Sequence, residues 1–325
     1  MINIAFFGTS QFAANMLSAL NALSKSSKYI LSMVVCKPIK DNDSLNQHSV
    51  KYLLKSLKHI KLYQPNNLKI TKKEGLYFYK TFIKLKIDLV IVTDYGFIIP
   101  NVLLKQPKYG FIGIHPSLLP QFRGASPIQY TILNKIKYSG ISIIKLNKRM
   151  DAGDIFYQKK IIIKSKDTNT TLKNKLINIG KKIIFIILPY IIEKKIFKIP
   201  QNHKKASYTF LMIKSSGEIN FKEPANFISK YIKALEPWPG SYTFHNNNQL
   251  KILKAKEIKI SYKKKYFINN QYGSIVKVNK QNILVQTGVN LLSLQLIQLE
   301  NRKKMWVNDF INGYLIKEGD ILGNK

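Results

Sequence analysis

The sequence predicts an α/β domain with a mostly parallel, doubly wound sheet, followed by a smaller β-rich domain. Up to residue 188, apolar β-type runs alternate with helical stretches, whereas beyond residue 208 short strands follow one another with turn residues between them. A chain of 325 residues is long enough for two domains with their own cores. We predict a first domain over residues 1–188, a basic linker over 189–207 and a second domain over 208–325.

The strands of the first domain are predicted from short apolar runs. Helical stretches lie between most of these runs, and strands joined by helices pair in parallel, with helices on both faces of the sheet. Gly8 follows the first run, but the full G-x-G-x-x-G pattern is missing, so this turn favours a plain strand-to-helix connection over a dinucleotide site. The predicted strands are residues 2–7, 30–35, 61–63, 89–93, 111–115, 141–146 and 155–163.

A helical stripe closes the first domain. Its apolar residues recur at helical spacing and indicate a helix that faces the core; they are Leu172, Leu176, Ile179 and Ile183. The apolar run 183–192 is about half as long as a membrane span and contains Pro189, so it favours a buried helix. From Pro189 to Ser207 the chain is polar and basic, which is typical of a linker.

The second domain is predicted from one helix and five strands. The helix follows Pro224 and carries an apolar stripe that ends at Leu235. Five short strands in this length suit an OB-like barrel, a common binder of nucleic acid; they are residues 242–244, 250–258, 273–278, 282–286 and 291–299. The lysines of 251–256 and 263–265 fit either RNA contacts or a solvated edge strand, and the sequence leaves both interpretations open.

Composition narrows the class of protein. The chain has 53 basic and 17 acidic residues, a formal charge of +36, which favours polyanionic partners, although a general enrichment in lysine would produce the same number. The single cysteine, Cys36, excludes an internal disulfide, and the five histidines lack metal-ligand spacing, so we expect no metal. Met1 leads directly into a strand-like run without a signal-type segment. We therefore expect a cytoplasmic protein that does not enter membranes.

The candidate active site lies at two loops. The predicted strand 111–115 ends at His115 and opens into a Pro- and Gly-containing loop, and the carboxyl edge of an open α/β sheet is where ligands bind. Histidine suits proton transfer and stabilisation of a developing oxyanion. Asp151 lies in a second loop, 148–154, and a carboxylate there can orient an imidazole. A lone histidine is more often structural, so the prediction depends on this pair meeting.

Several motifs resemble the methionyl-tRNA formyltransferase family along nearly the whole chain. The central ones are residues 115–120 (HPSLLP), 123–129 (RGASPIQ) and 151–154 (DAGD). The first of these is shared with other folate-dependent formyltransferases. The match narrows to the tRNA enzyme through 236–240 (EPWPG) and 308–313 (NDFING); the further matches are 7–13 and 94–100.

The resemblance implies a Rossmann-like formyltransferase fold and a defined reaction. A formyl group would pass from 10-formyltetrahydrofolate to the α-amino group of initiator methionyl-tRNA, with no metal, and we expect a monomer. His115, paired with Asp151, would donate to the oxyanion and help protonate the leaving nitrogen of the folate. Asp151 would keep the ring charged and help to draw a proton from the attacking amine. The second domain would bind tRNA.

The resemblance also assigns binding residues. One wall of the folate slot would be formed by Ser117, Leu118, Leu119 and Pro120, and the other by Tyr95, Gly96, Phe97, Ile98 and Ile99. The tRNA-binding candidates are Lys40, Arg123, Lys214, Arg302, Lys303 and Lys304. Ordinary packing for the leucines and solvated loop positions for the lysines are the alternative interpretations.

Three positions depart from the family pattern. Gly113 stands where the family has an asparagine that helps to polarise the formyl oxygen, and loss of one such donor typically costs about a hundred- to a thousandfold in rate. The loop after Pro38 is shortened and keeps Lys40 but no arginine, which affects the discrimination of initiator tRNA. Leu211 replaces the first of two lysines, of which Lys214 is the second.

These departures leave two alternative functions open. A folate-dependent formyltransferase that acts on a small amine would keep the same chemistry, although the lysine-rich second domain argues against it. A catalytically impaired RNA-binding relative would explain Gly113, but the retained pair of His115 and Asp151 argues against that interpretation.

Overall fold

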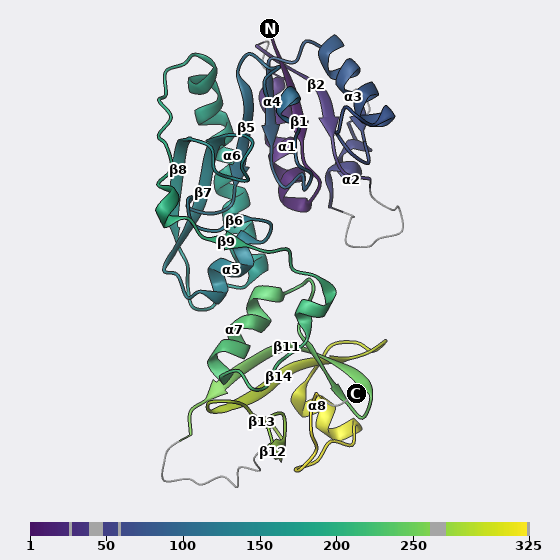
Figure 1. Ribbon diagram of the computed structural model, residues 1–325. Helices are drawn as coiled ribbons and strands as arrows, with labels where there is room; N and C mark the ends of the chain where they lie inside the picture. Colours follow the sequence, from purple (N-terminus) through teal and green to yellow (C-terminus); the bar gives the residue numbers. More distant parts are fainter. Residues whose placement is uncertain (26–27, 39–47, 58–59, 261–270, 324–325) are drawn as a thin grey trace. The chain divides into compact units, whose positions relative to one another are not determined.

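The computed structural model describes residues 1–25, 28–38, 48–57, 60–260 and 271–323. The chain forms two compact units. The first contains residues 1–127, 137–163 and 173–210, and the second contains residues 128–136, 164–172 and 211–325. Among the described residues, no helix is both long and apolar enough to cross a membrane. Figure 1 shows both units, which are described separately below.

A seven-stranded sheet forms the centre of the first unit (Figure 1). Its order is β3-β2-β1-β4-β5-β7-β8, and the pairs from β3 to β5 are parallel, while β7 and β8 run antiparallel. The mostly parallel sheet predicted from the sequence is therefore confirmed. The strands are β1 (Ile2–Phe7), β2 (Tyr29–Val35), β3 (Leu62–Tyr63), β4 (Leu89–Val92), β5 (Gly110–His115), β7 (Tyr138–Lys145) and β8 (Ile155–Ile162).

Helices cover both faces of this sheet, as predicted. On one face, Phe78 and Phe82 of α3 pack against Phe7, and Phe111 of β5 joins the same aromatic cluster. This cluster buries large ring surfaces, which contribute strongly to stability. The helices associated with this unit are α1 (Gln11–Ser24), α2 (Val50–Leu54), α3 (Lys73–Lys84), α4 (Asn101–Leu104) and α6 (Asn169–Ile192) from residue 173 onward, whereas residues 128–133 of α5 (Pro127–Leu133) belong to the second unit.

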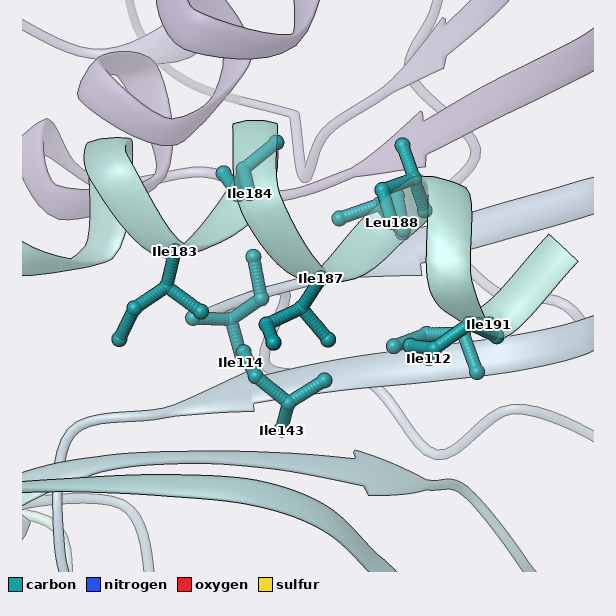
Figure 2. A pocket seen from close by; sticks show the side chains of 9 residues that line it. Ile112, Ile114, Ile143, Ile183, Ile184, Ile187, Leu188 and Ile191 are labelled. Atoms are coloured by element: carbon teal, nitrogen blue, oxygen red, sulfur yellow. The ribbon is translucent and has the colours of Figure 1, made fainter. Parts of the chain in front are cut away.

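The opposite face of the sheet packs against α6 (Figure 2). Isoleucine and leucine side chains line an apolar space of about 20 Å³ there. Strand side chains alternate between faces, so Ile112 and Ile114 point toward α6, whereas Gly113 and His115 belong to the face that also holds Phe111. This alternation separates the apolar seam from the candidate site.

The stretch predicted as a linker differs from expectation at its start. Helix α6 continues through Pro189 to Ile192, and its Phe185 and Ile186 are exposed, so the apolar run is buried on one face only. After the helix, His203–Lys205 forms the 3-10 helix η2, and β9 (Tyr208–Thr209) pairs with β6 (Arg123–Gly124). These contacts hold residues up to 210 within the first unit, although the sequence there is polar and basic.

The second unit is built on an antiparallel sheet of order β10-β11-β14-β13-β12, with β15 paired to β14. Among the described residues, β10 and β12 lie at the two ends of this order and do not pair with each other. Closure of the sheet into an OB-like barrel therefore stays a prediction. The elements are η3 (Lys214–Gly217), α7 (Ala225–Leu235), β10 (Tyr242–His245), β11 (Asn248–Ile258), β12 (Ile275–Asn279), β13 (Asn282–Gln286), β14 (Leu291–Leu299), β15 (Met305–Trp306) and α8 (Val307–Gly313).

A histidine–aspartate pair anchors the end of this unit. His245 is buried, and its Nε2 lies 3.0 Å from Oδ2 of Asp320, which also accepts from the backbone N–H of Lys317. Burial raises the pKa of Asp320, but the hydrogen bonds from Lys317 and His245 outweigh it and leave this pKa below its ordinary value. The carboxylate is therefore favoured in the folded state.

The pair predicts a pH-dependent contribution to stability. A carboxyl group with a lowered folded-state pKa stabilises the protein above its unfolded pKa, and this contribution is lost as pH falls through the folded value. We expect Asp320→Asn to destabilise the protein by about 1–3 kcal/mol at neutral pH and by less below about pH 4. Denaturant unfolding at pH 7 and pH 3.5 measures this difference. An equal loss of stability at the two pH values would show that the charge of Asp320 does not contribute.

Candidate active site

His115 ends β5 and is 7% exposed. The strand is buried along its whole length, so its last residue carries the imidazole to the carboxyl end of the sheet. Nε2 of His115 lies 2.8 Å from the carbonyl oxygen of Phe122. Because a carbonyl oxygen only accepts, Nε2 carries the hydrogen in this contact. The other ring nitrogen, Nδ1, is then left to interact with a second group.

That second group is Asp151. Its Oδ2 lies 3.6 Å from Nδ1 of His115 and accepts a hydrogen bond of 2.8 Å from the backbone N–H of Gly124. A carboxylate in this position can orient the imidazole through this nitrogen. The predicted meeting of the two side chains is therefore present in the structure.

The Asp151 loop reaches His115 from the opposite end of the strand pair. Strand β7 is antiparallel to β5, with Ser142 opposite His115 and Lys145 opposite Ile112. The loop after β7 therefore begins near the amino end of β5 and doubles back toward His115. Asp151 itself has a φ of 48°, an uncommon value for a residue other than glycine. The surrounding hydrogen bonds must hold this backbone conformation.

The loop over residues 117–120 is held by two polar side chains of the sheet. Ser142 accepts from the backbone N–H of Leu119 at 3.0 Å and donates to the carbonyl of Ser117 at 2.6 Å. Gln158 donates to Ser142 at 2.7 Å and to the carbonyl of Leu119 at 2.9 Å. Ser117 and Leu119 are buried, whereas Leu118 and Pro120 are partly exposed. The loop is thus fixed in one shape beside His115.

The second predicted wall, residues 95–99, follows β4, which pairs with β5 in parallel, so both loops leave the same edge of the sheet. Tyr95 is buried, and burial raises its pKa well above the ordinary value, which keeps the phenol neutral. Ile98 is 83% exposed. Within the described parts of the chain, the backbone N–H groups of residues 96–99 have no acceptor. Such groups are available to a planar heterocycle.

Comparison with known proteins gives the family. Residues 2–188 match the model described as formyl transferase, and residues 212–315 match the formyl transferase C-terminal domain. Methionyl-tRNA formyltransferase of Caldicellulosiruptor saccharolyticus is 35% identical, over 99% of this chain and 100% of its own. That of Orientia tsutsugamushi is 34% identical over the same shares. The chain belongs to the methionyl-tRNA formyltransferase family.

Solved structures of other formyltransferases share the fold. WlaRD, a sugar 3N-formyl transferase, has a TM-score of 0.63 and 19% identity, and the match covers 93% of this chain and 99% of that chain. Methionyl-tRNA formyltransferase from Clostridium thermocellum has a TM-score of 0.53 and 21% identity, covering 79% and 94%. As a member of the family, this protein is an enzyme that transfers formyl groups.

The space beside Gly113, where the resemblance predicts an asparagine, is filled by other side chains. A Cβ atom at Gly113 would lie 2.7 Å from Cδ2 of Leu146 and 3.0 Å from Cγ1 of Ile144. Both neighbours are side-chain atoms, and Leu146 packs against the aromatic cluster of the first unit. An asparagine at this position would therefore require a shift of Leu146. The structure therefore has no free space for an asparagine side chain at position 113.

We expect Gly113→Asn to raise the rate of formyl transfer by about tenfold or more, because one added oxyanion donor is typically worth about a hundredfold. The same change should cost about 1–3 kcal/mol in stability through crowding of Leu146. Gly113→Ala is the matched control, since it brings the Cβ atom without the amide. Equal rates in steady-state assays of the two variants would show that the amide adds nothing.

The residues predicted to contact phosphate differ in their exposure to solvent. Arg123 is 2% exposed, and its guanidinium donates to Gln201 at 2.7 Å and 3.2 Å and to Tyr208 at 3.3 Å. A buried guanidinium with these partners is not presented to a phosphate, so this position supports an internal role. The exposed candidates are Lys214 in η3 and the residues between β14 and β15, Arg302, Lys303 and Lys304. Lys40 and Lys263–Lys265 lie outside the described residues.

Sequence reasoning missed four polar residues that the structure places at the site. Ser142 and Gln158 hold the loop 117–120, and Gln201 and Ser207 contact the loops that carry Asp151 and Phe122. Polar residues at 142 and 158, opposite each other in strands that flank the Asp151 loop, were the available signal. Gln201 and Ser207 had none, because they lie in a stretch with the composition of a linker.

Proposed function

We propose that this protein transfers the formyl group of 10-formyltetrahydrofolate to the α-amino group of initiator methionyl-tRNA, which yields N-formylmethionyl-tRNA. The observation that carries the proposal is the pair of His115 and Asp151, 3.6 Å apart, beside two loops at one sheet edge. The named relatives match over nearly the whole chain, including the second unit. The proposed monomeric state and cytoplasmic location rest on the sequence.

The residues around the folate slot fit the formyl donor. The backbone N–H groups of residues 96–99 would bind the pterin, and the fixed loop 117–120 would form the facing wall. When bound, the donor supplies an electrophilic formyl carbon. His115 would direct its Nε2 hydrogen toward the charge that develops on the formyl oxygen, and it must first release the carbonyl of Phe122.

Asp151 has two tasks in this mechanism. Its Oδ2 lies against Nδ1 of His115, so it stabilises the doubly protonated ring that can donate to the oxyanion and pass a proton to the leaving nitrogen. It would also help to draw a proton from the attacking amine. Direct attack by the amine requires no enzyme nucleophile, and no covalent intermediate with the protein is part of the proposal.

The tRNA would be bound through phosphate contacts that involve the second unit. The formal charge of +36 and the exposed side chains of Lys214, Arg302, Lys303 and Lys304 suit a polyanion. These four side chains are exposed in the described structure. Phosphate binding by them is therefore the part of the proposal that depends on charge alone.

One observation favours a second candidate function. Residue 113 is glycine, so it lacks the amide that the resemblance predicts as a polarising donor, and Leu146 lies in the space beside it. An RNA-binding relative with impaired catalysis would have the same feature. The proposed enzyme and this relative differ in whether the acceptor is formylated.

A formylation assay separates the candidates. Radiolabelled or mass-resolved product is measured with charged initiator tRNA, charged elongator tRNA and small amines, each with 10-formyltetrahydrofolate. We expect product with initiator tRNA. Product with small amines alone would show that the acceptor is a small amine and not a tRNA. Binding of tRNA without any product would support the RNA-binding relative with impaired catalysis.

Binding of tRNA should weaken steeply as salt rises. Each phosphate contact releases condensed counterions, and the slope of log K against log salt is about −0.7 to −0.9 per contact. We expect Lys214→Met to reduce the magnitude of this slope by about one contact. Filter binding between 50 and 200 mM salt measures it. An unchanged slope would show that Lys214 does not contact a phosphate of the tRNA.

A further inference from the structure

The segment 201–209, which we call the strap, contacts the backbone of the two residues that carry the groups facing His115. It lies in the first unit, after α6, in a stretch whose composition is that of a linker. The two groups are the carboxylate of Asp151, against Nδ1, and the carbonyl of Phe122, against Nε2. The strap is therefore in a position to define the environment of both ring nitrogens.

Gln201 connects the strap to the Asp151 loop. Its side chain is buried, and its Nε2 donates to the carbonyl of Asp151 at 2.8 Å and to that of Gly153 at 2.6 Å. Its Oε1 accepts from the guanidinium of Arg123. Both donor hydrogens and the acceptor of the amide are used, so the side chain has one orientation.

Ser207 connects the strap to the other loop. Its hydroxyl accepts from the backbone N–H of Phe122 at 2.9 Å, and its carbonyl accepts from the N–H of Arg123 at 2.9 Å. Phe122 has a φ of 60°, a conformation that is strained for a bulky residue. Asp151, with a φ of 48°, is held by Gln201 in the same way. Strained residues at a site persist when their surroundings over-determine them.

We propose that Gln201 and Ser207 are positioning residues for formyl transfer: they hold the Asp151 carboxylate and the Phe122 carbonyl at the two nitrogens of His115. The inference deepens the proposed function and rests on it. Neither residue touches the reacting atoms. Their effect passes through His115, so it should appear in the turnover number and in the protonation behaviour of the ring, with substrate binding largely retained.

Gln201→Glu is the sharpest test. The carboxylate keeps the size and the acceptor for Arg123, but it loses both donors and places negative charge beside two carbonyl oxygens. We expect kcat to fall about 10- to 100-fold, with KM for 10-formyltetrahydrofolate and Kd for tRNA within about twofold, because a small misplacement of a catalytic group has effects of this size. Gln281→Glu, at an exposed turn of the second unit, is the matched control.

Ser207 provides a second pair of variants that keeps the test decisive if Gln201→Glu unfolds. Ser207→Ala removes the hydroxyl that accepts from Phe122, whereas Ser207→Thr keeps it. We expect Ser207→Ala to lower kcat and Ser207→Thr to restore it. Equal kcat for the alanine, threonine and wild-type proteins would overturn the inference for Ser207 whether or not Gln201→Glu folds, and a folded and fully active Gln201→Glu would overturn it for Gln201.

A readout without turnover separates this inference from the proposed function. The pH titration of the His115 ring, followed by NMR in wild type, Gln201→Glu and Gln281→Glu, reports the environment of both nitrogens. We expect the midpoint of this titration to shift, relative to wild type, only in Gln201→Glu. An undisplaced titration would overturn the inference even in a protein without measurable transferase activity, whereas wild-type inactivity with a displaced titration would overturn only the proposed function.

Discussion

Replacing His115 with alanine is expected to lower the rate of formyl transfer by about a thousandfold or more. The imidazole is proposed both to stabilise the oxyanion and to transfer a proton, and each of these contributions is typically worth about a hundredfold or more. Steady-state kinetics with charged initiator tRNA measure the loss. The side chain is buried at the end of β5 and points to a loop carbonyl, so tRNA binding should stay within a few-fold.

The control for this variant is Tyr77→Ala, which removes an exposed ring from α3, outside the site. It should leave turnover unchanged. Near-normal turnover in His115→Ala would remove His115 from the mechanism. A parallel loss of turnover and tRNA binding would indicate unfolding, which thermal denaturation of the same sample would reveal.

The second large effect is expected for Asp151→Asn, with kcat reduced about a hundredfold and KM little changed. Asparagine keeps the size of the side chain and an oxygen that can accept from Gly124, but it removes the negative charge at 3.6 Å from Nδ1 of His115. The doubly protonated ring would lose its partner.

Asp154→Asn is the matched control in the same loop. Asp154 pairs with Lys198 at 2.7 Å, and both side chains are partly exposed. Exposed ion pairs contribute about 0–1 kcal/mol to stability, so this variant should retain its rate. If the two substitutions slowed the enzyme equally, the charge of Asp151 would have no specific role.

Periodicity and motif positions in the sequence predicted much of the first unit. Apolar runs marked its strands because a parallel sheet covered on both faces buries whole strands, as β5 shows. The helix α7 was predicted from its apolar stripe. The pairing of His115 with Asp151 was also predicted, because each follows an apolar run and opens into a glycine-containing loop.

The location of Arg123 could not be predicted from its neighbours. Its position in a Pro- and Gly-containing loop suggested an exposed cation, but the structure buries it against Gln201 and Tyr208. These partners lie about eighty positions along the chain, and one sequence carries no signal for a contact over that separation. Charge predicts solvent exposure only when no distant side chain supplies the hydrogen bonds.

The sequence by itself determined most of the strands, the loops that carry the chemistry and the glycine at position 113, because these depend on local patterns and residue identity. Only the tertiary structure decided that the Asp151 loop doubles back, that Leu146 occupies the space beside Gly113, and that a linker-like segment holds the loops around His115. These features depend on strand direction and on hydrogen bonds between residues far apart in the chain. Such contacts form only when the whole unit folds.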